Sequence, residues 1–356
     1  MDWRPPADPD KPVCPYRRNF TVDIKSHTPA APFGGRDYGS GTRAVVPPQT
    51  LQSIKQTELV IRNPPLRTAD PPAPRILKLS ITEELAVVDG RGAQLAVCTI
   101  APKVAGQATF QAVAKIYDPL YYSFPNKDVP SAPCDVTRDA DIDYSREAAA
   151  YEHLQRIGQA GLFAPKYFGS WTFTIPIQIG ETTQQRSVRL VLIENLPGPS
   201  IRELCLTSRA ATFDEAYRLE ILARVLDGNA KLLLKGINQR DLASRNVILV
   251  HPPNIQPAAQ QQTFPRVVLI DYNISIIYEQ TRRKISPFNG ATLPPNPVEL
   301  YWNNTQILMQ FRGWIPAEWE DNPRLYQEWL SNRFGGKNMA SYAPLRAKLE
   351  FYKWVA

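Results

Sequence analysis

Length, composition and charge limit the classes of protein to which this chain can belong. Its 356 residues suffice for one large domain or two lobes, and 43% apolar with 21% charged residues are ordinary values for a globular protein. The net charge of +7 comes from short basic runs with no stripe of basic and aromatic residues, so we expect no nucleic-acid partner.

Cysteine and histidine usage bears on metal chemistry and on the cellular compartment. The four cysteines are widely spaced and only three histidines occur, which argues against a zinc cluster and a Ser-His-Asp triad. No apolar run approaches the length of a membrane span, and the first residues lack the apolar core of a secretory signal. We therefore expect an intracellular monomer, in the cytoplasm or nucleus, without a membrane partner.

The first 74 residues have an unusual composition. Fourteen of the 34 prolines lie before residue 75, together with Gly-Gly and Gly-Ser-Gly sequences. Such segments are typical of extended or loosely ordered chain. Residues 1–74 are therefore predicted to form a largely extended segment outside the main fold.

The next part of the chain has the pattern of a sheet followed by a helix. Apolar content predicts three strands, over 75–89, 93–101 and 109–118. Because short turns separate them, we expect an antiparallel meander. A helix is predicted over 145–158, with Ser145 as its cap and Gly158 at its end.

The remaining elements change from strands to helices. Strands are predicted over 166–179 and 187–196 around a turn at 180–186, and short strands over 246–250 and 266–272 flank a Gln- and Pro-rich loop. A long amphipathic helix is predicted over 212–236, with a capping box from Thr212 to Glu215 and Gly236 at its end. The chain from about 295 is predicted to be helical. This order indicates an α+β fold with units at 75–196 and 197–356.

A polar loop between the long helix and the next strand carries the strongest sign of chemistry. It reads QRDLASRN over 239–246, and the sequence LIDYN over 269–273 contains Asp271, which lies 30 residues downstream of Asp241. The amide oxygen of Asn246 and the carboxylate of Asp271 are the hard ligands that Mg²⁺ takes. Asp241 can accept a proton from a hydroxyl, and Arg245 can neutralise phosphate charge. These groups suit phosphoryl transfer.

These two sequences resemble the protein-kinase-like superfamily, nearest to its divergent, abbreviated fungal members. QRDLASRN is similar to the kinase catalytic loop H-R-D-L-x-x-x-N, and LIDYN is similar to D-F-G. The resemblance covers about residues 75–275. It implies a bilobal α+β fold with a β-rich N-lobe, one main N-lobe helix and a shortened, mainly helical C-lobe.

The resemblance extends to the parts of the chain that bind nucleotide in kinases. Lys115, in VAKIYD, looks like the lysine that reaches the α- and β-phosphates, and Glu147 looks like its partner on the helix. Gly90, Gly92 and Val97 match the glycine-rich loop, although Leu95 replaces the third glycine.

IENLPG over 193–198 resembles the hinge of a kinase, with Ile193 as gatekeeper. The backbone groups of Glu194 and Leu196 are then implied to meet the adenine of ATP. The catalytic group implied by the family pattern comprises Asp241 as base, with Lys115, Glu147 and Arg245, while Asn246 and Asp271 are implied to hold Mg²⁺. ATP and Mg²⁺ are thus the expected cofactors.

Several positions depart from the family pattern. Gln239 stands in place of the usual histidine, and Asn273 replaces the glycine of D-F-G, where an asparagine can tolerate φ > 0. Arg245 is the cation available in the catalytic loop, since Ala243 is found where kinases carry lysine. Few residues follow Asp271, and no clear A-P-E segment occurs among them.

Three functions remain open on these residues. The first is an ATP- and Mg²⁺-dependent kinase that transfers the γ-phosphate to a hydroxyl acceptor, Ser, Thr or Tyr of a protein. The second is a pseudokinase-like interaction module, which the departures favour. The third is a small-molecule kinase similar to the aminoglycoside and choline kinases, which the lack of a peptide platform favours. Taken singly, Lys115 also fits a lysine that reaches to water, and Asp271 fits a turn residue.

Overall fold

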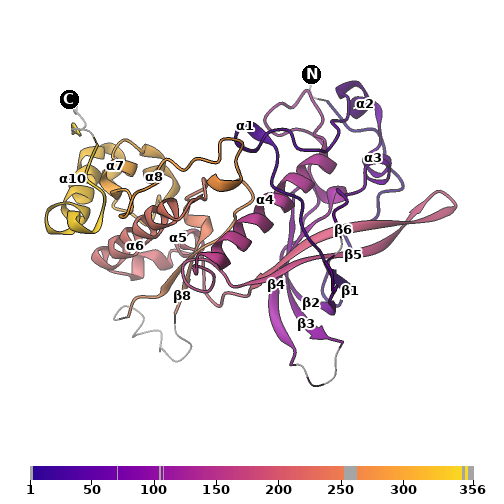
Figure 1. Ribbon diagram of the computed structural model, residues 1–356, viewed down its shortest axis with the longest axis horizontal. Helices are drawn as coiled ribbons and strands as arrows, with labels where there is room; N and C mark the ends of the chain where they lie inside the picture. The colour runs from indigo at the N-terminus through magenta and orange to yellow at the C-terminus, as the bar shows by residue number, and fades with distance from the viewer. Residues whose placement is uncertain are drawn as a thin grey trace. The chain divides into compact units, whose positions relative to one another are not determined.

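The computed structural model describes residues 3–69, 71–103, 106, 108–251, 263–346 and 349–351. The chain divides into two compact units, drawn in Figure 1. Unit 1 comprises Met1–Glu152 and Lys166–Asn195, and unit 2 comprises His153–Pro165 and Leu196–Ala356. The functional domains expected from the sequence, at 1–74, 75–196 and 197–356, stay a prediction.

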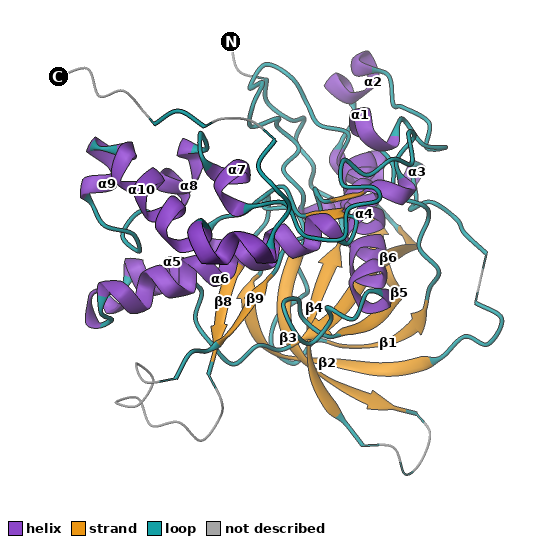
Figure 2. Ribbon diagram, turned by 60° about the vertical axis from the view of Figure 1, so that its left-hand side comes forward, coloured by secondary structure: helices purple, strands orange, loops and turns teal. Residues whose placement is uncertain are grey.

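Unit 1 is built on a closed antiparallel sheet of six strands (Figure 2). The strands are β1 (Thr21–Ser26), β2 (Ile76–Ala86), β3 (Gln94–Pro102), β4 (Phe110–Tyr117), β5 (Tyr167–Ile179) and β6 (Thr182–Glu194), in the order β1-β2-β3-β4-β6-β5. The predicted meander of the second to fourth strands is confirmed. Lys25 and Ser26 of β1 pair with β5, and this pairing closes the sheet.

The turn between β5 and β6 is shorter than the sequence indicated. Ile179 pairs with Thr182, so Gly180 and Glu181 form a two-residue hairpin turn, with φ 55° at Gly180. The polar residues 182–186 were predicted to belong to the turn, yet they continue the strand. They do so because each finds backbone partners on β5 in an unbroken register.

The proline-rich segment was expected to be largely extended, and this is wrong for four stretches. It forms β1 and three short helices, α1 (Gly35–Tyr38), α2 (Pro48–Ser53) and α3 (Gln56–Arg62). Proline is compatible with the first turn of a helix, and Pro48 takes that position in α2. Ile24 and Leu59 are completely buried, so apolar contacts with unit 1 supply order that composition does not reveal.

The main helix of unit 1, α4 (Val136–Arg156), begins nine residues before its predicted start. Ser145 is therefore an interior residue, whose hydroxyl donates to the carbonyl of Ile142 at 3.1 Å. Asp135 provides the cap instead, because its carboxylate accepts the backbone N–H of Arg138 at 3.0 Å. Ala148, Tyr151 and Leu154 of the predicted apolar face are buried, and Tyr151 stacks on Tyr167 of β5 with ring centroids 5.7 Å apart.

Unit 2 is mainly helical. Its helices are α5 (Ile201–Leu206), α6 (Glu215–Leu234), α7 (Pro297–Tyr301), α8 (Thr305–Gln310), α9 (Glu318–Asp321) and α10 (Pro323–Phe334). Its short strands form two pairs, β7 (Ile237–Asn238) with β10 (Ile276–Ile277) and β8 (Val247–Val250) with β9 (Arg266–Leu269). The α+β class predicted from the sequence is confirmed, with strands concentrated in unit 1 and helices in unit 2.

Short 3₁₀-helices also occur in both units. They lie at Pro119–Tyr121, Arg209–Thr212, Ser244–Asn246, Tyr278–Gln280 and Gly336–Ser341. The predicted Gln- and Pro-rich loop lies outside the described residues from 252 to 262. Each helix within the described part of the chain is too short or too polar to traverse a bilayer.

The long helix α6 starts differently from its prediction. Asp214 is the N-cap residue, and the Thr212 hydroxyl donates to Arg209 in the preceding turn, so the predicted capping box does not form. The predicted end is correct, since Gly236 follows with φ 86°. The guanidinium of Arg218 on α6 donates to the backbone carbonyl of Trp314 at 2.6 Å. The indole N–H of Trp314 donates to the backbone carbonyl of Arg218 at 2.9 Å, and these two bonds attach the C-terminal helices to α6.

Candidate functional site

A buried ion pair joins the sheet of unit 1 to its helix. Lys115 on β4 is 7% exposed, and its Nζ lies 2.5 Å from Oε2 of Glu147, which is completely buried on α4. The hydroxyl of Tyr117 donates to the same Oε2 at 2.6 Å. Burial and the nearby Glu147 raise the pKa of Tyr117 well above its usual value, so this hydroxyl stays a donor at neutral pH. The two residues predicted to pair are thus brought together.

The predicted glycine-rich loop is a tight turn between β2 and β3. Gly90 and Gly92 have φ of 77° and 125°, conformations that other residues rarely adopt. The completely buried Gln94 closes the turn, because its amide donates to the carbonyls of Val88 and Gly92 at 3.0 and 2.9 Å. Leu95 lies beyond this turn on β3, opposite Lys115, so the position of the third glycine belongs to the strand. Val97 also lies on β3, is buried and pairs with Val113.

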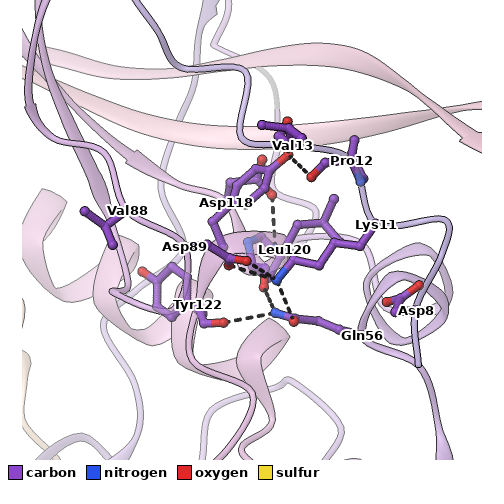
Figure 3. A network of polar contacts seen from close by, with 12 residues as sticks. Asp8, Lys11, Pro12, Val13, Gln56, Val88, Asp89, Asp118, Leu120 and Tyr122 are labelled. Carbon is purple, nitrogen blue, oxygen red and sulfur yellow. Dashed lines mark hydrogen bonds and ion pairs between the residues drawn. The ribbon is translucent and has the colours of Figure 1, made fainter. Parts of the chain in front are cut away.

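The N-terminal segment binds this glycine turn through a polar network (Figure 3). The ammonium of Lys11 donates to both carboxylate oxygens of Asp89 at 2.8 Å and to Gln56 at 3.2 Å. Gln56 in turn donates to the carbonyls of Pro119 and Tyr122 at 2.8 and 3.0 Å. Sequence reasoning missed these residues, because Lys11 and Asp89 are 78 positions apart and no local pattern connects them.

A cavity of about 310 Å³ opens beside the glycine turn. Its lining includes Gly92, Tyr122, Asp139 and Asp143, and the Tyr122 hydroxyl donates to Asp143 at 3.2 Å. Burial, reinforced by the negative charge of Asp135, raises the pKa of Asp139 from 3.8 to about 6. The surroundings of Asp139, in the first turn of α4, therefore favour the protonated, uncharged form of its carboxyl group.

We expect Asp139→Asn to stabilise the protein near pH 8. The folded-state pKa of Asp139 is raised to about 6, so the folded protein binds its proton more tightly than the unfolded chain, and this advantage is lost as pH rises from about 4 through 6. At about 1.4 kcal/mol per pH unit, removal of the charge should add roughly 1–3 kcal/mol to the free energy of unfolding. Urea unfolding at pH 8 and pH 4 measures this. A gain of equal size at both pH values would contradict the assignment.

The residues predicted to form the hinge lie at the end of β6 and just beyond it. In unit 1, Ile193 pairs with Val113 of β4, and the N–H of Glu194 donates to the carbonyl of Lys166 at 2.9 Å. In unit 2, the carbonyl of Leu196 accepts the N–H of Gly198 at 2.9 Å. Adenine recognition by Glu194 and Leu196 stays a prediction.

Asp241 lies at the centre of a hydrogen-bonded loop in unit 2. The Arg245 guanidinium donates to its two carboxylate oxygens at 2.5 and 2.7 Å. The Asn246 amide nitrogen donates to the carbonyl and to Oδ2 of Asp241 at 2.9 and 2.8 Å. Oδ1 of Asp241 therefore accepts one of these bonds and Oδ2 accepts two. A carboxylate oxygen has two lone pairs, so Oδ1 retains capacity to accept from a hydroxyl.

Gln239 ties this loop to the segment that contains Asp271. Its completely buried side chain accepts the N–H of Asp241 at 2.7 Å and donates to the carbonyls of Ile270 and Asp271 at 3.1 and 2.8 Å. The N–H of Ile270 also donates to the carbonyl of Asn246 at 2.9 Å. These bonds hold the loop that carries Asp241 and Asn246 next to the segment that contains Asp271.

The turn after β9 differs from its prediction in one respect. The positive φ expected at Asn273 occurs at Asp271 instead, with φ 64°, while Asn273 has ordinary geometry. Asp can adopt this conformation more readily than most residues, and the bond from Gln239 to its carbonyl helps to hold it. Tyr272 is completely buried next to it. The strained residue is therefore the candidate ligand itself, and such strain is common at functional sites.

The donor set of this loop fits Mg²⁺. The Asn246 amide nitrogen donates both of its hydrogen bonds to Asp241. The amide oxygen of Asn246 therefore points away from Asp241 and can act as an acceptor or ligand. An amide oxygen and the carboxylate of Asp271 are ligands that Mg²⁺ accepts, with phosphate oxygens and water completing its shell. Among the described residues no group of three His, Cys, Asp or Glu side chains is placed to hold a metal ion.

Comparisons with known proteins give a likeness at the level of structure. No model of a known protein family matches the chain, and no curated protein sequence matches it either. Among solved structures 609 chains match, including the crystal structure of the BubR1 kinase domain, with a TM-score of 0.37 and 14% identity over 61% of this chain. The match spans about half of that structure's chain, at 51%. Over this part, the chain is structurally similar to a protein kinase domain.

Proposed function

We propose that the protein is an ATP- and Mg²⁺-dependent phosphotransferase of the protein kinase type. The observation that carries this proposal is the buried pair of Lys115 with Glu147. Removing two charges from water costs so much that a buried ion pair adds little net stability over apolar residues of similar size. A lysine held in this way, on the strand predicted for a phosphate-binding lysine, is best explained by an anionic ligand.

The residues divide the chemistry between them. Lys115 would neutralise the α- and β-phosphates, and Glu147 would hold its ammonium in place. Asp241 would orient the acceptor hydroxyl and take its proton on Oδ1, while Arg245 would offset charge on the transferred phosphoryl group. Asn246 and Asp271 would hold Mg²⁺, which supplies compensation of phosphate charge. The turn at Gly90 and Gly92 would cover the phosphates, with Val97, Glu194 and Leu196 around the adenine.

The acceptor is proposed to be a hydroxyl of a protein side chain, Ser, Thr or Tyr. A small-molecule hydroxyl is the alternative, and acceptor screens with purified protein distinguish the two. An intracellular monomer without membrane or nucleic-acid partners stays our expectation, as does the likeness to abbreviated fungal kinases.

A pseudokinase-like interaction module is the second candidate function. Two observations favour it. The first is that the Arg245 guanidinium contacts both carboxylate oxygens of Asp241. The bonds from Lys11 to Asp89 also tie down the glycine turn, which limits its movement. Each contact occupies groups next to those proposed for catalysis or for nucleotide binding, and a measurement of Mg²⁺·ATP binding distinguishes the two candidate functions.

We expect Mg²⁺·ATP to raise the melting temperature of the wild-type protein. A ligand at a hundredfold excess over its dissociation constant stabilises the folded state by about 2.7 kcal/mol. Lys115→Met should lose this shift, whereas Lys78→Met, which removes an exposed lysine from β2, should keep it. Thermal shift with ATP, with and without Mg²⁺, measures the effect. No shift of the wild type at millimolar nucleotide would contradict nucleotide binding and favour the interaction module without ligand.

A further inference from the structure

The N-terminal segment of the chain forms polar contacts with α4. We call residues 33–66 the brace. Arg43 and Asp141 form an ion pair in which the two side chains are 7% and 8% exposed, although they are 98 positions apart in the sequence. Arg43 also donates to the carbonyls of Asn63 and Pro64 at 3.0 and 3.2 Å. One guanidinium therefore links the C-terminal end of the brace, at Asn63 and Pro64, to Asp141 of the helix.

The brace continues along α4 toward Glu147. Arg146, the residue next to Glu147, donates to the carbonyls of Phe33 and Gly34 at 2.9 and 2.5 Å. Gly34 has φ 87°, and a Cβ there would lie 2.8 Å from Ile142, so glycine permits this close approach. The brace thus holds α4 at positions 141, 142 and 146, immediately before the glutamate that pairs with Lys115.

The same network connects α4 to the sheet. The carboxylate of Asp141 accepts the N–H of Leu66 at 3.1 Å, and the carbonyl of Leu66 accepts from Arg189 of β6 at 3.1 Å. Arg189 also donates to the hydroxyl of Thr172 on β5 at 2.5 Å. The brace is therefore hydrogen-bonded to α4 and to β6, and β6 is bonded in turn to β5.

We infer that Arg43 is a positioning residue, which acts through Asp141 to keep α4 in the place where Glu147 meets Lys115. The helix would then need no partner protein to form this pair. The role of the Lys115–Glu147 pair in binding phosphate rests on the proposed function. The pair itself lies within unit 1, and its opening can be measured without nucleotide.

The test measures how readily Lys115 is acylated by an amine-reactive ester, read by peptide mass spectrometry. Because Lys115 is enclosed and bonded to Glu147, the reagent reaches it when the pair opens. Arg43→Gln should raise the rate at Lys115 at least about fivefold, through local opening of α4. The rate at Lys78, which is already exposed, should not change. Arg17→Gln is the matched control, since Arg17 forms an exposed ion pair with Glu84 of β2.

A double-mutant cycle distinguishes an effect of Arg43 on the Lys115–Glu147 pair from a general destabilisation of unit 1. In a Glu147→Gln background, where the pair is already broken, Arg43→Gln should change the rate at Lys115 by less than about twofold. An equal increase in both backgrounds, or an unchanged rate in Arg43→Gln alone, overturns the inference. If Arg43→Gln does not fold, Arg146→Gln decides by the same criteria, because it detaches the brace from the helix side. Failure of the wild type to bind Mg²⁺·ATP would overturn the proposed function, while the labelling result would still decide this inference.

Discussion

Replacing Asp241 by asparagine is expected to slow phosphoryl transfer by about 10²–10⁴-fold, the usual contribution of a positioned general base. Asparagine has nearly the same shape, so the loop should keep its fold, but it cannot take the proton of the acceptor hydroxyl. Arg245 also loses the charge with which it pairs. Binding of Mg²⁺·ATP, measured by thermal shift, should be retained because Asp241 is not one of the residues proposed to hold the nucleotide. Transfer or hydrolysis of labelled ATP provides the measurement of rate.

Asp227→Asn is the matched control for this experiment. Asp227 lies on α6, is 27% exposed and pairs with Lys231 four positions later, whereas Asp241 is 26% exposed and pairs with Arg245 four positions later. The two substitutions remove the same charge from carboxylates of similar exposure that each form an ion pair four positions along the chain, so we expect Asp227→Asn to keep the wild-type rate. Equal rates for wild type and Asp241→Asn would dispose of the proposed mechanism. An inactive wild type that still binds nucleotide would favour the pseudokinase-like module.

The second large effect is expected on stability. Asp118, at the end of β4, is completely buried and accepts the guanidinium of Arg186 at 2.6 Å and the hydroxyl of Tyr16. Asp118→Asn would leave the charge of Arg186 buried without its partner, which typically costs about 3–5 kcal/mol. For a unit of this size the melting temperature should fall by roughly 10 °C. Unfolding in urea, followed by circular dichroism, measures the change.

Two further variants show whether charge is the cause. Tyr16→Phe removes one hydrogen bond to the carboxylate and should cost less, about 1.5–3 kcal/mol. Asp23→Asn breaks an exposed ion pair with Lys103 and should stay within about 0.5 kcal/mol of the wild type. If Asp118→Asn proves no more destabilising than Asp23→Asn, the buried triad does not stabilise unit 1 in the way described.

Several elements were predictable because their signals are local. The strands β2, β3 and β4 follow short apolar runs, and the buried face of α4 follows residues at helical spacing. The order of the motifs placed Lys115 on a strand and Glu147 on a helix, and the structure brings the two together. The loop at 239–246 was recognised from its spacing, although the hydrogen bonds that Gln239 makes to the segment of Asp271 were not.

The start of α4 shows where local signals fail. The sequence from Asp139 to Asp143 is rich in carboxylates and precedes the predicted start of the helix, yet it forms helix. Asp141 is stable there because Arg43, far away in the chain, supplies its countercharge. A pattern search has no means of finding a partner at that separation, so it placed the start of the helix at Ser145, a residue that suits a cap.

The sequence by itself predicted most of the strands and helices after residue 75, their order and the residues proposed for phosphoryl transfer, since these predictions depend on periodicity and on neighbours a few positions apart. The tertiary structure alone decided that the proline-rich segment closes the sheet with β1 and holds α4 through Arg43. The physical reason is that ion pairs such as Arg43 with Asp141, and backbone bonds between strands, join residues whose closeness arises only after the chain has folded.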